Sequence, residues 1–192
     1  MKEGFEMERS IREFIGITII IVILFFAMSG ISSLGKNEID PETIGKFKIY
    51  SKDINTDKEI IVEEFGFYKD VDTIEKRLKI IASKLSDSEF KMLPIEIIGI
   101  EEIDGKIIAT FNLKENEENL NESDWTKYSE PSWAKNFFQG SAGGSWTCYT
   151  LQTTMLQPEY DGKWIDGVRF LYNGEENKNF QHIEGLDQIK YR

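Results

Sequence analysis

A glycine-rich stretch in the C-terminal third is the part of this sequence that most suggests chemistry. GSAGGSWTCYTLQTTML, residues 140–156, has the outline of a tight turn that leads into a helix, a setting in which many proteins bind phosphate. A Walker-type loop needs Lys and Ser or Thr after its last glycine, whereas Ser and Trp follow here. We therefore expect the glycines to turn the chain sharply and the next serine to cap the helix. These residues are Gly140, Gly143, Gly144 and Ser145.

The remaining reactive side chains do not form a catalytic pattern. Ser141 lacks the G-x-S-x-G setting of a hydrolase nucleophile, and the chain has only one histidine, His182. Cys148 falls on an apolar helical stripe, where a thiol usually fills space. Glu101 and Glu102 are adjacent on an expected strand, so their carboxylates point to opposite faces. The sequence thus predicts a protein that is not an enzyme and needs no cofactor.

Metal binding is also not expected. One Cys and one His are too few for a Cys/His zinc site. The acidic run KENEENLNESD, residues 114–124, alternates carboxylates as some calcium loops do, but it lacks their D-x-D-x-D-G spacing. We expect this segment to be a solvated loop.

Large aromatic side chains gather after that loop and recur at the start of the second expected helix. Such rings usually cover the edge of a core, but an exposed cluster would bind a partner, a sugar or a peptide by stacking. Both interpretations stay open for Trp125, Tyr128, Trp133 and Trp146.

Composition limits the possible partners. A chain of 192 residues with 40% hydrophobic residues suits one domain plus appendages. Its formal net charge of −11 would be repelled by nucleic acid or by an anionic lipid surface. We expect no nucleic-acid binding, and a basic protein surface fits better as a partner.

The N-terminal region predicts a membrane anchor. No charged residue occurs in residues 14–34, and a helix of this length rises roughly 30 Å, enough to cross a bilayer. A cleaved signal peptide is the alternative, although the head, residues 1–13, mixes acidic with basic residues. We expect an uncleaved span, a linker over residues 35–44 and an extracytoplasmic domain over 45–192.

The periodicity of that domain predicts an α+β fold. Alternating or β-branched runs predict strands at 46–53, 59–67 and 168–172, and Asp104-Gly105 predicts a tight hairpin turn within 95–113. Apolar residues at helical spacing predict two helices. One starts near Asp72 with a capping box and the other ends before Pro158. The expected domain is one antiparallel or mixed sheet of about five strands packed against two helices.

The order of these elements resembles the GerMN domain of bacterial sporulation and spore-germination proteins. The resemblance covers 45–174 and is carried by TIEKRLKIIASKL, by IEIIGIEEIDGKIIATFNL after Pro94, by GSAGGSWTCYTLQTTMLQ and by VRFLYNG. It implies a small module similar to ring-building motifs, which acts between membranes as an envelope assembly component without catalytic residues. The best-known relative is a lipoprotein with two copies of the domain, whereas this chain has one copy and an expected span.

Overall fold

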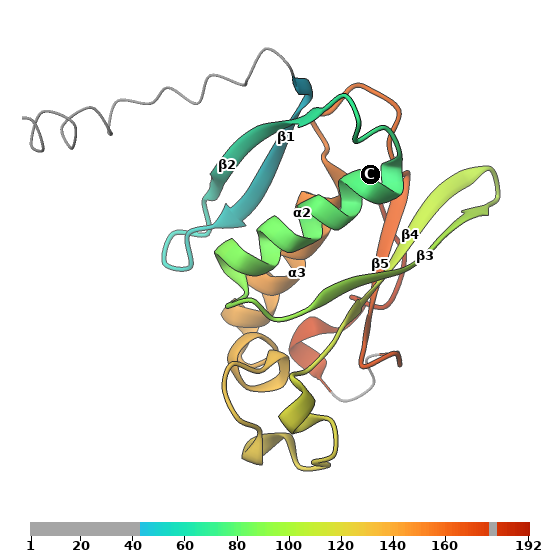
Figure 1. The fold of residues 1–192 in the computed structure, drawn as a ribbon. Coiled ribbons are helices and arrows are strands. Elements are labelled where there is room, and N and C mark those ends of the chain that lie inside the picture. The colour runs from blue at the N-terminus through green and yellow to red at the C-terminus, as the bar shows by residue number, and fades with distance from the viewer. Residues whose placement is uncertain (1–42, 177–179) are drawn as a thin grey trace, which may run out of the picture. The chain divides into compact units, whose positions relative to one another are not determined.

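The computed structural model describes residues 43–176 and 180–192, which form an α+β domain (Figure 1). The helices and strands are β1 Thr43–Lys52, β2 Glu59–Tyr68, α2 Ile74–Glu89, β3 Ile95–Ile103, β4 Lys106–Leu113, α3 Ser141–Leu156, β5 Gly167–Tyr172 and β6 Lys190–Tyr191. Short 3-10 turns lie at Glu117–Asn119, Trp125–Lys127 and Gln181–Ile183, and a π-helical turn lies at Trp133–Phe137. The predicted α+β class is confirmed.

The predicted membrane anchor lies outside this part of the chain. The head at 1–13 and the span at 14–34 are not among the described residues. Within 43–176 and 180–192, no helix has both the length and the apolar composition that crossing a bilayer requires. The first strand begins at Thr43, so the last two positions of the expected linker belong to the folded domain.

The larger sheet is mixed and has the strand order β3-β4-β5-β6. Its antiparallel hairpin is the predicted one, since Ile103 pairs with Lys106 across Asp104–Gly105. Both turn residues have positive φ, 50° and 75°, which a two-residue hairpin turn requires. The predicted register shift is also present, between Ile97 and Gly99. β5 then joins β4 in parallel, and β6 adds a short antiparallel pairing.

The core lies between the helices and one face of this sheet. The apolar stripe predicted for the first helix is buried, with Leu78, Ile81 and Leu85 inaccessible to solvent. From α3, Leu151 and Met155 enter the same cluster. The sheet contributes the alternating β4 residues Ala109, Phe111 and Leu113. Burial of these side chains supplies the main driving force for folding.

The cap of α2 differs from the prediction by one residue. Thr73 has an extended backbone and its hydroxyl accepts a hydrogen bond from the Lys76 amide at 3.2 Å, so Thr73 is the N-cap. The Asp72 carboxylate instead binds the Lys76 ammonium at 2.8 Å. This hydrogen bond is the main cause that lowers the pKa of Asp72.

The prediction of one sheet with about five strands is wrong. The strands expected at 46–53 and 59–67 are present, but β1 and β2 form a separate antiparallel pair. The reason is that α3 occupies the position beside β1 that a further strand would take.

Thr154 of α3 and Gln157, the C-cap residue that follows the helix, satisfy the backbone of β1 as a neighbouring strand would. Gln157 accepts from the Lys48 amide at 2.9 Å and donates to the Lys48 carbonyl at 2.7 Å. Thr154 accepts from the Tyr50 amide at 3.0 Å and donates to the Tyr50 carbonyl at 3.2 Å. All these groups are buried, so the pairing removes unsatisfied donors and acceptors from the core.

The acidic segment 114–124 is not simply a solvated loop, because its second residue is buried. Glu115 is 1% exposed, and its carboxylate accepts hydrogen bonds from the Ser132 hydroxyl at 3.0 Å and the Ala134 amide at 2.9 Å. The Tyr172 hydroxyl donates to the same oxygen at 3.0 Å. These donors tie the loop to the π-helical turn and to the end of β5.

Replacing Gln157 by Ala should lower the free energy of unfolding by about 2–4 kcal/mol, because the Lys48 amide and carbonyl would stay buried without partners. Urea unfolding of the full chain, followed by tryptophan fluorescence, measures this change. Gln152→Ala is the matched control at a half-exposed position in α3, where we expect a loss below about 0.5 kcal/mol. Equal losses in the two variants would contradict the role of Gln157.

Candidate functional site

The glycine-rich stretch forms the first turns of α3 instead of a loop before it. Gly140 is the N-cap with φ 73°, and the helix begins at Ser141. Gly143 and Gly144 therefore lie inside the helix, and no side chain caps its first amides. The sharp turn is confirmed at Gly140 alone. The predicted cap at Ser145 is wrong, because Ser145 already has helical neighbours on both sides.

A close backbone contact explains one of the helical glycines. A Cβ atom at Gly144 would lie 2.2 Å from the carbonyl oxygen of His182, nearer than two such atoms can approach. The helix therefore packs directly against the backbone of the turn at Gln181–Ile183. At Gly143 a Cβ would meet nothing within 4 Å. Gly144 thus serves packing and not phosphate binding.

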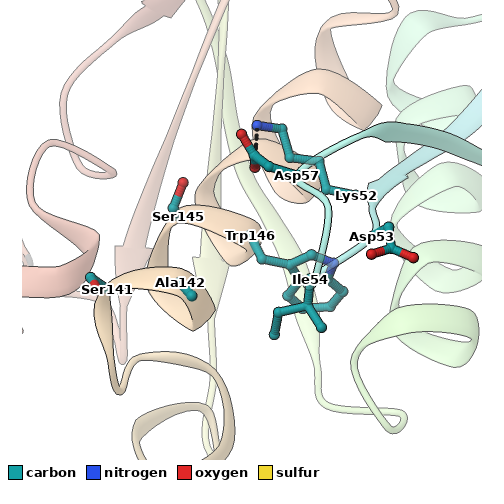
Figure 2. Close-up of a pocket in the computed structure, with 8 residues that line it drawn as sticks. All are labelled: Lys52, Asp53, Ile54, Asp57, Ser141, Ala142, Ser145 and Trp146. Carbon is teal, nitrogen blue, oxygen red and sulfur yellow. Dashed lines mark hydrogen bonds and ion pairs between the residues drawn. The ribbon is translucent and has the colours of Figure 1, made fainter.

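The start of α3 and the turn between β1 and β2 enclose a pocket of ≈ 340 Å³ (Figure 2). Its lining residues are Lys52, Asp53, Ile54, Asp57, Ser141, Ala142, Ser145 and Trp146. The volume is at the lower end of the range for small-molecule sites.

The charged groups of this pocket are already engaged. Lys52 and Asp57 form an ion pair at 2.9 Å. The Asp53 carboxylate accepts hydrogen bonds from the amides of Thr56 at 2.8 Å and Asn55 at 2.9 Å, which lower the pKa of Asp53. These contacts stabilise the turn between β1 and β2.

Two of the candidate aromatic residues are held in the core or at its edge. Trp133 is completely buried, and its indole N–H donates to the Lys114 carbonyl at 3.1 Å. Trp146 is half-buried, stacks on Phe137 with 6.1 Å between ring centroids, and donates to the Ser51 hydroxyl at 3.1 Å. Neither indole N–H is left to bind a ligand.

The other two candidate aromatic residues lie elsewhere. Trp125 is 36% exposed and packs edge-to-face with Phe180, with 6.1 Å between the ring centroids. Tyr128 is half-buried against the core. Of the four candidates, only Trp146 lines the pocket. They do not form a single stacking platform.

The residues with reactive side chains are not connected into a catalytic site. Within 43–176 and 180–192, no hydrogen bond or ion pair joins Ser141, Cys148 and His182. Burial raises the pKa of the Cys148 thiol to about 11, which suits a packing role and disfavours a nucleophile. In the same part of the chain, no cluster of three or more His, Cys, Asp or Glu side chains is placed to hold a metal.

Both sheets have an outer strand that exposes apolar side chains. The residues are Ile60, Ile61 and Val62 on β2, and Ile98 and Ile100 on β3. Neither strand has a second strand neighbour within the described residues. The sequence analysis did not identify these positions as functional. The available signal was that each strand has adjacent apolar residues, Ile60 to Val62 on β2 and Ile97 with Ile98 on β3, so a single covered face cannot bury all of them.

Gly144→Ala should lower the free energy of unfolding by about 1–3 kcal/mol, because the added methyl group would clash with the backbone at His182. Gly143→Ala is the matched control, and it should raise that free energy by about 0.5–1 kcal/mol because alanine favours helix and meets no neighbour. Urea unfolding of both variants measures the difference. If both substitutions are stabilising, the close approach of α3 is wrong.

Iodoacetamide should alkylate Cys148 roughly a hundredfold more slowly than an ordinary thiol at pH 8, since burial raises its pKa from 9.0 to about 11. The raised pKa also makes the free energy of unfolding depend on pH. The Cys148 thiol ionises at a lower pH in the unfolded chain than in the folded chain, so burial of the neutral thiol stabilises the fold fully below pH 9. This stabilisation is lost as the pH rises towards 11. Alkylation in concentrated urea is the control for intrinsic reactivity. Equal rates in the folded and unfolded chain would contradict the burial.

No family model, curated protein or solved structure matches this chain. The features that bear on function are therefore the pocket, the two open strands and the chemistry of their residues.

Proposed function

We propose that the chain is a membrane-anchored, extracytoplasmic protein of the bacterial envelope that acts as a non-catalytic assembly or scaffold component. One observation carries the proposal: the outer strands of both sheets expose apolar side chains. An open strand binds an extended segment through backbone hydrogen bonds, and side-chain contacts add specificity. This mode of binding needs no reactive group.

The anchor and the cellular setting come from the sequence. The uncharged run at 14–34 would hold the domain at the membrane, with the folded part outside the cytoplasm. The resemblance to the GerMN domain favours a role in sporulation or spore germination. Protein partners in the envelope, including further copies of the chain, are consistent with this setting.

The alternative is an extracytoplasmic sensor that binds a ligand or the cell wall in the pocket beside α3. The presence of Trp146 in the pocket lining favours this alternative. The engaged carboxylates of Asp53 and Asp57 and the burial of Trp133 favour the assembly function.

The full chain with a C-terminal affinity tag, produced in a spore-forming bacterium, tests the proposal. It should stay in the membrane fraction after alkaline carbonate washing and should co-purify with other envelope proteins. The double variant Ile21→Arg with Leu24→Arg should move to the soluble fraction, because charges at the centre of a span are costly. Ile54→Arg with Met92→Arg, two exposed positions of the domain, is the matched control and should stay with the membrane.

Two outcomes would reverse the proposal. A wild-type chain found in the soluble fraction would contradict the anchor, and a shortened soluble product would indicate a cleaved signal peptide. Recovery of cell-wall fragments without any protein would favour the sensor.

A further inference from the structure

The turn that follows β5 contains the one Asn-Gly pair of the sequence, Asn173-Gly174. Asparagine deamidates most readily before glycine, because glycine has no side chain to shield its backbone nitrogen. Both residues have positive φ, 48° and 80°, and both are exposed to solvent. Since water reaches the site, the hydrogen bonds of the turn decide whether the reaction can start.

Deamidation is an intramolecular reaction followed by hydrolysis. The backbone nitrogen of Gly174 attacks Cγ of Asn173 and forms a C–N bond. The bond from Cγ to the side-chain nitrogen breaks, and ammonia leaves with the proton of the Gly174 amide. Water then opens the cyclic imide at either carbonyl and leaves aspartate or isoaspartate. The only reactant besides the chain itself is therefore water.

The fold holds both reacting groups in hydrogen bonds. The Gly174 amide donates to Oδ1 of Asn112 at 2.7 Å. Oδ1 of Asn173 accepts from the Glu115 amide at 2.9 Å. The attack requires the Gly174 nitrogen to lose its proton and the Asn173 side chain to turn towards that nitrogen. Both hydrogen bonds must therefore break before the reaction starts.

Backbone hydrogen bonds keep the turn itself in place. The Tyr172 amide donates to the Glu175 carbonyl at 2.9 Å, and the Glu175 amide donates to the Tyr172 carbonyl at 3.0 Å. The Asn173 amide donates to the Leu113 carbonyl at 3.0 Å. The turn is thus attached to the end of β4, and it rearranges only when the end of β5 separates from β4.

These observations lead to one proposal, which goes beyond the proposed assembly function and does not depend on it. We infer that Asn173 is a deamidation site that the folded domain keeps unreactive and that opening of the end of β5 makes reactive. Isoaspartate adds one carbon to the backbone of the turn, so the bonds from the turn to Leu113 and Glu115 cannot all form again. Deamidation would therefore loosen one of the ties between the acidic loop and the sheet.

Incubation of the purified full chain at mildly alkaline pH tests this inference. Mass spectrometry of proteolytic peptides measures the conversion of Asn173. The folded chain should deamidate at this residue at least about tenfold more slowly than the chain unfolded in guanidinium chloride, which gives the intrinsic rate of the dipeptide.

Three variants separate local opening of the turn from a general loss of stability. Asn112→Ala removes the acceptor of the Gly174 amide and should speed deamidation of Asn173 in the folded chain by about threefold to tenfold. Asn121→Ala, at an exposed position of the acidic loop, is the matched control and should leave the rate unchanged. Gln157→Ala weakens the distant contact between α3 and β1, and it should speed the reaction less than Asn112→Ala does.

The outcomes are independent of the proposed function. Equal rates in the folded and the unfolded chain, or an unchanged rate in Asn112→Ala, would overturn the inference. An equal acceleration in Gln157→Ala would overturn it as well, since Asn173 would then react from the globally unfolded chain. None of these results depends on whether the chain is anchored in a membrane, so the inference and the proposed function can fail separately.

Discussion

The arrangement of this domain depends on the hydrogen bonds that two side chains at the C-terminal end of α3 form with the backbone of β1. Thr154 and Gln157 give β1 the partners that a third strand would provide. Because these bonds close one edge of the small sheet, β2 is the strand of that sheet whose outer side has no strand neighbour among residues 43–176 and 180–192. They also fix the direction of α3, whose other end lies against the backbone of His182 at Gly144.

A second polar centre organises the opposite end of the domain. The buried carboxylate of Glu115 has neutral donors at hydrogen-bond distance, among them Ser132 and Tyr172. A buried charge is costly unless its lone pairs are satisfied, so these donors must stay in place together. Burial, followed by the nearby Glu115 carboxylate, raises the pKa of Tyr172 and keeps its hydroxyl a donor. The long acidic loop is thereby tied to the sheet.

Local patterns in the sequence are sufficient to predict the helices and strands, but they do not predict how these elements assemble into sheets. The hairpin at Asp104–Gly105 and the stripe of α2 follow from turn chemistry and periodicity, which act over a few residues. The separate sheet depends on contacts between Lys48 and Gln157, more than a hundred residues apart. No local pattern reveals that a glutamine will pair with a strand. The prediction that Gly144 forms a turn was wrong for the same reason. Its packing partner, His182, lies in the C-terminal tail, whose sequence has little periodic pattern.

Bulges and charged side chains protect the open strands of both sheets. An exposed apolar edge strand is a template on which another copy of the same strand can pair. On β3, the extra residue Ile98 interrupts the regular register, and Glu96 and Glu101 form ion pairs with basic side chains of the same domain. On β2, the bulge at Val62 and the ion pairs of Glu63 and Glu64 have the same effect. The two edges are therefore protected by the same means.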